Sequence, residues 1–180
     1  MSQDYLTKIF EPFTREQNTT KSKIAGTGLG MSIVKKYVEN QETGSGILKG
    51  RNVLLAEDND LNAEIAEIIL ERAGLKTERV ENGIQCINRI MEMPVGTYDM
   101  VLMDIQMPKM DGYKATQEIR HLPDKAKTCI PIIAMTANAF EEDKKAALAA
   151  GMNGHIAKPI QVDKLLSTLS EIIRQQENFQ

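Results

Sequence analysis

Short apolar segments alternate with segments of helical apolar spacing throughout residues 50–176, and this alternation limits the fold more than any other feature. Each apolar segment is too short for a typical helix and ends at turn-forming or charged residues. Five successive strand-then-helix units indicate a parallel sheet covered by helices on both faces. The sequence therefore predicts a doubly wound α/β fold. The predicted strands are 52–56, 76–80, 98–103, 131–135 and 154–157, and the predicted helices are 61–73, 83–91, 113–121, 139–150 and 162–175.

Polar side chains stand where four of these predicted strands end. They are Glu57 and Asp58 after the first strand, Asp104 after the third, Thr136 after the fourth and Lys158 after the fifth. The carboxyl ends of parallel strands meet at one edge of a sheet, where ligands bind, so we expect these side chains to lie together. Each has a simpler interpretation when taken alone, such as a solvated turn, a helix cap or an exposed lysine. Their coincidence at four strand ends favours a functional site.

The chemistry of this set points to phosphoryl transfer. Three neighbouring carboxylates repel one another unless a cation lies among them. Oxygen ligands favour Mg²⁺, with Mn²⁺ as a substitute. With its charge screened, Asp104 can attack phosphorus as a nucleophile, while Thr136 donates a hydrogen bond and Lys158 a charge to the phosphoryl oxygens. The sequence therefore predicts an aspartyl phosphate site.

Four motifs carry a resemblance to a known family. AEDN (56–59), LMDIQMPKMDG (102–112), MTAN (135–138) and AKP (157–159) together resemble the signatures of the response regulator receiver domain. The resemblance implies a flavodoxin-like sheet of strand order 2-1-3-4-5, with the receiver domain over residues 50–176. It also implies that Asp104 is the phosphoacceptor. The implied Mg²⁺ ligands are Glu57, Asp58, Asp104 and the backbone carbonyl of Gln106.

Further roles follow from the same resemblance. Thr136 corresponds to the switch hydroxyl and Lys158 to the lysine that pairs with the phosphoryl group. Gln106 and Asn138 occupy positions that tune the phosphoryl lifetime. His155 stands where many members carry an aromatic switch residue, and a partly buried strand histidine is favoured over a catalytic one. A coupling between pH and a switch motion of His155 with Thr136 is a hypothesis. His121 is expected to be a simple helix C-cap.

The family resemblance also suggests partners. The DNxxN pattern formed by Asp58, Asn59 and Asn62, with IQMPKMDG, looks most like receivers fused to hybrid histidine kinases. The implied partner is a histidine kinase or a His-phosphotransfer protein. The face around residues 139–165 is expected to change on phosphorylation and to engage partners or a second copy. A receiver catalyses its own phosphorylation and dephosphorylation, and independent kinase activity is not expected.

Residues 1–40 carry a second resemblance. IFEPF (9–13) and GTGLGMS (26–32) resemble the F box and G2 box at the end of a sensor histidine kinase ATP-binding domain. The upstream nucleotide-binding boxes of that family are absent, and the only histidines are His121 and His155. We therefore expect an incomplete remnant over 1–40 and a linker over 41–49. Gly26, Gly28 and Gly30 are not expected to bind a cofactor, although residual binding of nucleotide or of a kinase partner is the alternative.

Other function classes find less support. A flavin- or nucleotide-binding protein of this fold would have small residues where the acidic stretch from Glu57 to Asp60 stands. A transcription regulator would need a DNA-binding domain after the last helix. The net charge is −3 and 4% of the residues are aromatic. The sequence shows no stripe of basic residues interleaved with aromatic ones, which is the pattern expected for binding nucleic acid. We find no transmembrane run or signal peptide. Cys86 and Cys129 lack metal or redox spacing, so buried thiols and a cytoplasmic location are expected.

Overall fold

The computed structural model describes residues 46–137 and 140–178, all within one compact unit that extends over Gly44–Gln180. The N-terminal resemblance, including Gly26, Gly28 and Gly30, lies outside the described residues. The strands are β1 (Asn52–Ala56), β2 (Lys76–Val80), β3 (Met100–Asp104), β4 (Ile132–Thr136) and β5 (Gly154–Ala157). The helices are α3 (Asp60–Arg72), α4 (Gly83–Glu92), α5 (Gly112–Arg120), α6 (Lys125–Thr128), α7 (Glu141–Ala149) and α8 (Val162–Glu177).

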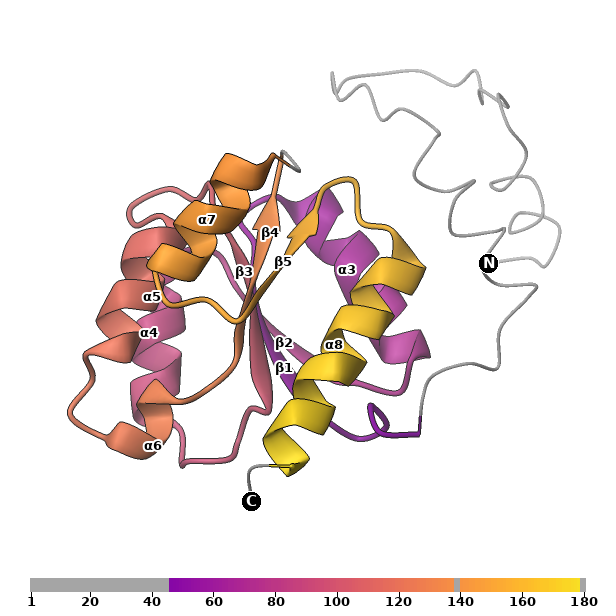
Figure 1. Ribbon diagram of the computed structural model, residues 1–180, viewed down its shortest axis with the longest axis horizontal. Coiled ribbons are helices and arrows are strands. Elements are labelled where there is room, and N and C mark those ends of the chain that lie inside the picture. Colours follow the sequence, from indigo (N-terminus) through magenta and orange to yellow (C-terminus); the bar gives the residue numbers. More distant parts are fainter. Residues whose placement is uncertain (1–45, 138–139, 179–180) are drawn as a thin grey trace, which may run out of the picture. The chain divides into compact units, whose positions relative to one another are not determined.

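The five strands form a single sheet in the order β2-β1-β3-β4-β5, and every neighbouring pair is parallel. This confirms the predicted fold class and strand order. Helices α3 and α8 cover one face of the sheet, and α4, α5 and α7 cover the other (Figure 1). Parallel strands need such crossovers because each connection must return to the opposite end of the sheet.

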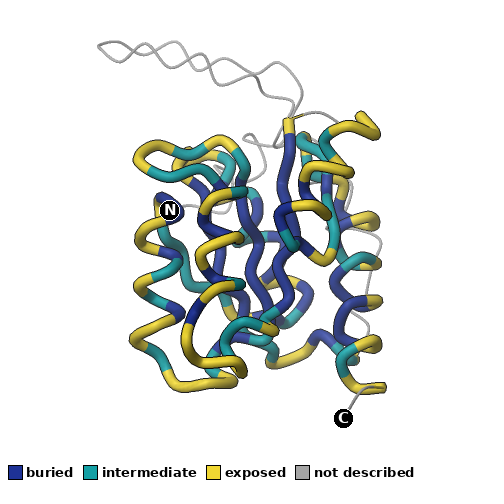
Figure 2. Tube along the Cα trace, turned by 60° about the vertical axis from the view of Figure 1, so that its left-hand side comes forward, coloured by how far each residue is buried: buried dark blue, intermediate teal, exposed yellow. Residues whose placement is uncertain are grey.

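Side-chain alternation along the strands divides the core between the two faces. Leu54 and Ala56 of β1 join the apolar cluster formed with α4, α5 and α7, which includes Cys86 and Ile119. Val53 and Leu55 point to the opposite face because successive strand residues alternate. All of β3 and β4 is buried, which explains their continuous apolar sequences (Figure 2).

The boundaries of β1, β2 and β5 match the predicted ones, the others differ by at most two residues, and two of these shifts matter for the site. β3 extends through Asp104 and β4 through Thr136, so both polar residues are the last members of their strands. Asn59 caps α3 and Asp111 caps α5 through side-chain bonds to backbone N–H groups. Gly74, with φ of 84°, adopts the left-handed conformation that ends α3.

Two sequence-based predictions fail in the segment before β4. The four-residue helix α6 was not predicted, because its sequence Lys-Ala-Lys-Thr has no apolar periodicity. Cys129 is the C-cap of α6 and is exposed, contrary to the expectation of two buried thiols. Cys86 is buried as expected, and burial raises the pKa of its thiol to about 12.

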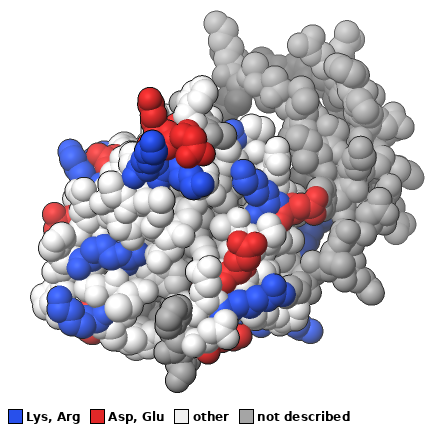
Figure 3. Space-filling view, viewed as in Figure 1, with Lys and Arg blue, Asp and Glu red and all other residues white. Residues whose placement is uncertain are grey.

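The described surface carries mixed charge. On the face seen in Figure 3, lysine and arginine side chains are interspersed with aspartate and glutamate. None of the described helices is long and apolar enough to span a membrane. His121 is the C-cap of α5, as predicted, and its Nδ1 lies 2.6 Å from the Gln117 carbonyl oxygen.

Candidate functional site

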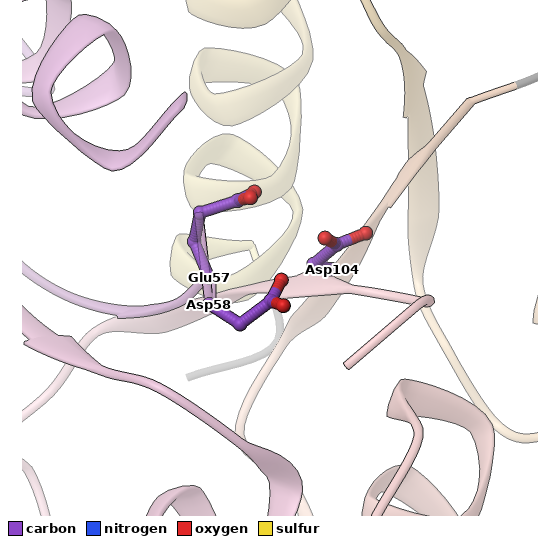
Figure 4. A group of neighbouring side chains, drawn as sticks. All are labelled: Glu57, Asp58 and Asp104. Atoms are coloured by element: carbon purple, nitrogen blue, oxygen red, sulfur yellow. The ribbon is translucent and has the colours of Figure 1, made fainter. Parts of the chain in front are cut away.

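Three carboxylates converge at the carboxyl edge of the sheet. Glu57 and Asp58 follow β1, and Asp104 ends the neighbouring strand β3. One ligand oxygen from each lies within 4.8 Å of the others. Figure 4 shows the three carboxyl groups gathered around the same space. Glu57 and Asp104 are only 1% and 5% exposed, whereas Asp58 is exposed, so the cluster opens to solvent on the side of Asp58.

Lys158 lies between two of these carboxylates. Its ammonium nitrogen is 2.6 Å from Glu57 Oε2 and 2.7 Å from Asp104 Oδ2. The backbone places it there, because the Lys158 N–H continues the β5 ladder by donating to the Thr136 carbonyl at 2.7 Å. One ammonium beside three carboxylates leaves an excess of two negative charges. Such an excess favours the binding of a divalent cation among the three carboxylates.

Asp104 is held from two directions. Lys158 pairs with Oδ2, and the backbone N–H of Gln106 donates to Oδ1 at 3.2 Å. Thr136 ends β4, the strand beside β3, and is buried. The register pairs Asp104 with Met135, which places Thr136 one residue further along the same edge. The structure thus brings Glu57, Asp58, Asp104, Thr136 and Lys158 to one edge, as the sequence predicts.

The remaining predicted positions are less defined. Gln106 lies two residues after the end of β3 and is exposed. Its carbonyl as a metal ligand and its effect on phosphoryl lifetime remain predictions. Asn138 lies outside the described residues. His155 is partly buried on β5, as the favoured interpretation has it.

Two residues that sequence reasoning assigned no role support the acidic segment. Arg79 of β2 donates from Nε to the Glu57 carbonyl at 3.0 Å and from Nη2 to the Asp58 carbonyl at 3.2 Å. The same guanidinium is 2.8 Å from Asp60 Oδ1. Asn62 of α3 donates to Glu57 Oε1 at 3.1 Å. The DNxxN pattern drew attention to Asn62, which is its second asparagine. Nothing in the sequence pointed to Arg79 except its charge on a predicted strand.

The match to a family model decides the family. The model for the response regulator receiver domain matches residues 53–170.

The chain belongs to the response regulator receiver domain family.

The curated relatives include a sensor kinase/phosphatase and a histidine kinase. The chain is 33% identical over 196 residues to the autoinducer 2 sensor kinase/phosphatase LuxQ of Vibrio vulnificus, covering 89% of this chain and 22% of that protein. It is 37% identical over 125 residues to the peroxide stress-activated histidine kinase mak1 of Schizosaccharomyces pombe, covering 69% of this chain and 8% of that protein. The chain thus spans less than a quarter of the length of either relative.

Solved receivers share the fold. The receiver domain of sensor histidine kinase PA1611 from Pseudomonas aeruginosa, which holds a magnesium ion in its active site cleft, is 39% identical with a TM-score of 0.62. That match covers 69% of this chain and 98% of the other. The receiver domain of Ssk1 from Saccharomyces cerevisiae, solved with the histidine phosphotransfer protein Ypd1, is 27% identical with a TM-score of 0.62. It covers 71% of this chain and 92% of the other.

The receiver's stability should depend on the charge of His155. Burial lowers the pKa of this imidazole, and the positive charges of Lys144 and Lys164 lower it further, against an opposing effect of Glu141. The folded state therefore binds fewer protons than the unfolded state near the unfolded pKa of about 6.5. The contribution of neutral His155 to the free energy of unfolding is complete above the unfolded pKa and is lost as pH falls through the folded pKa. We expect the free energy of unfolding to fall in acid, and His155→Phe to remove part of that fall.

Urea unfolding of the parent and of His155→Phe, from about pH 7.5 to about pH 5, measures this difference. His121→Gln is the matched control, because its ring is exposed at the end of α5. Parallel pH curves for the parent and His155→Phe would contradict the prediction.

Proposed function

We propose that this receiver is the phosphoacceptor module of a two-component phosphorelay and that Asp104 accepts the phosphoryl group from a phosphohistidine. The observation that carries the proposal is the placement of a nearly buried Asp104 carboxylate beside both the Lys158 ammonium and the acidic pair Glu57 and Asp58. In the transfer, the N–P bond of phosphohistidine breaks and a carboxylate oxygen of Asp104 bonds to phosphorus; the ring nitrogen keeps the electron pair, and because the other ring nitrogen is protonated, the histidine leaves as the neutral imidazole.

The residues present fit a magnesium ion. Glu57, Asp58 and Asp104 supply hard oxygen donors, and their charge is only partly balanced by Lys158. The carbonyl of Gln106 is the proposed fourth protein ligand, and Mn²⁺ is the proposed substitute. When bound, the ion supplies charge neutralisation for the carboxylates and the phosphoryl oxygens. The magnesium-bound PA1611 receiver supports this assignment.

The chain's own residues carry the remaining steps. Lys158 already contacts Asp104, so its ammonium can turn from Glu57 toward an oxygen of the new phosphoryl group. Thr136 follows Met135, the residue of β4 that pairs with Asp104. Its hydroxyl is the proposed hydrogen-bond donor to a second phosphoryl oxygen. Its movement, with that of His155 on β5, is the proposed switch. Gln106 and Asn138 are the proposed determinants of phosphoryl lifetime.

A histidine kinase or a His-phosphotransfer protein is the proposed partner. The Ssk1 receiver complex with Ypd1 supports this kind of partner. The face around residues 139–165 is the proposed surface for a second copy. The free thiols Cys86 and Cys129 support a reducing, cytoplasmic compartment.

We propose further that the division into 1–40, a linker at 41–49 and a receiver at 50–176 reflects a hybrid histidine kinase. Residues 1–40 would then derive from the last part of its ATP-binding domain. The LuxQ alignment supports this origin, because it covers 89% of the chain and so reaches beyond the receiver match at 53–170.

Intact mass after incubation with acetyl phosphate and Mg²⁺ tests the proposed function. We expect the parent to gain one phosphoryl group and Asp104→Asn to gain none, because the amide is not a nucleophile of comparable strength. Asp124→Asn is the matched control, since either side chain can cap α6 at this exposed position. A parent that stays unlabelled, or a labelled Asp104→Asn, would overturn the proposal.

A further inference from the structure

The two asparagines of the DNxxN pattern have different contacts. Asn59 Oδ1 accepts a hydrogen bond from the backbone N–H of Asn62 at 3.0 Å, and this is the N-cap of α3. The Asn62 side chain turns the other way and donates from Nδ2 to Glu57 Oε1 at 3.1 Å. Helix capping therefore accounts for Asn59 but not for the side chain of Asn62.

Glu57 needs such a donor. Its carboxylate is almost completely buried, and its other oxygen pairs with Lys158 at 2.6 Å. A buried carboxylate is stabilised only when hydrogen bonds or charges satisfy both oxygens. Lys158 is shared with Asp104, and in the proposed transfer its ammonium turns from Glu57 toward an oxygen of the phosphoryl group on Asp104. Asn62 is then the contact that keeps Glu57 in place.

We propose that Asn62 is a positioning residue that holds the Glu57 carboxylate toward Asp58 and Asp104. This inference rests on the proposed phosphoacceptor function. An amide suits the position because its NH₂ donates to a carboxylate without adding charge to an already acidic cluster. Aspartate at the same place would add a fourth carboxylate to the cluster of Glu57, Asp58 and Asp104. Partners of metal-binding side chains orient those ligands in this way.

Magnesium binding measured by calorimetry, without any phosphodonor, tests the inference. We expect Asn62→Ala to weaken Mg²⁺ binding about tenfold, because outer contacts of this kind change metal affinity by about 10–100-fold. Glu64→Ala is the matched control, because Glu64 is exposed two residues further along α3. Its Mg²⁺ affinity should equal that of the parent.

A double-mutant cycle separates positioning from a structural role. If Asn62 acts through Glu57, the double variant Glu57→Ala/Asn62→Ala should bind Mg²⁺ like Glu57→Ala alone, within about twofold. Equal losses from Asn62→Ala with and without Glu57 would overturn the inference, as would parent-like affinity of Asn62→Ala. In both cases a parent that still takes one phosphoryl group leaves the proposed function intact. A parent that neither binds Mg²⁺ nor is labelled contradicts the function itself.

Discussion

Lys158→Met should lower the free energy of unfolding of this receiver by about 3–5 kcal/mol in buffer without divalent cations. Among the described side chains, the Lys158 ammonium pairs with both Glu57, at 2.6 Å, and Asp104, at 2.7 Å. Its removal takes this positive charge away from two buried carboxylates that lie beside Asp58, and only neutral hydrogen-bond donors of Asn62 and Gln106 remain in the contacts described above. Because a domain of this size is stable by only about 5–15 kcal/mol, the loss is a large fraction of the total. Urea unfolding followed by circular dichroism measures it.

Three comparisons sharpen this prediction. Lys158→Arg keeps the charge and should lose less stability than Lys158→Met. Lys145→Met removes an exposed lysine of α7 and should stay within about 0.5 kcal/mol of the parent. Mg²⁺ should stabilise Lys158→Met more than the parent, because the variant cluster is more negative and tighter binding to the folded state stabilises that state more. A loss no greater than that of Lys145→Met would show that the carboxylates do not need the ammonium.

Gly112→Ala should destabilise the receiver by about 1–3 kcal/mol or more and impair phosphorylation of Asp104. A Cβ at this position would lie 2.3 Å from the Asp104 carbonyl oxygen and 2.9 Å from Met103 Cγ. The first contact is with backbone, so no rotamer change can relieve it. The Gly112 N–H also donates to the Ile105 carbonyl at 3.0 Å, which ties the start of α5 to the end of β3. The methyl group must therefore displace either α5 or Asp104.

Gly46→Ala is the control for Gly112→Ala, because a Cβ at Gly46 meets nothing within 4 Å. Denaturant unfolding and intact mass after acetyl phosphate treatment should both separate the two variants. Parent-like stability together with parent-like labelling of Gly112→Ala would contradict the close packing of α5 on β3.

The sequence predicted the sheet and the main site residues because both depend on local patterns. The run Met100–Met103 is apolar and ends at a carboxylate, so a buried strand with an acidic end can be read from neighbouring residues. The rule that parallel strands share a carboxyl edge then joins Asp104 to Glu57, Asp58 and Lys158. His155 was likewise placed correctly on a strand with partial burial.

Contacts between distant side chains were beyond the same reasoning. The bonds from Arg79 to the Glu57 and Asp58 carbonyls require β2 to lie beside β1 with the observed register. The position of Lys158 between Glu57 and Asp104 depends on the β4–β5 pairing. Helix α6 is too short and polar to produce a periodic signal, and the exposure of Cys129 follows from it. Packing, rather than local preference, decides each of these features.

The ion pair between Glu57 and Lys158 joins residues 101 positions apart in the chain. During synthesis the acidic residues leave the ribosome long before their cation does. A nascent or proteolytically clipped polypeptide that stops short of β5 contains Asp104 but lacks Lys158, the cation that contacts it at 2.7 Å. If Asp104 is the phosphoacceptor, as we propose, its labelling should depend on completion of the sheet and should identify molecules whose last strand has joined the others.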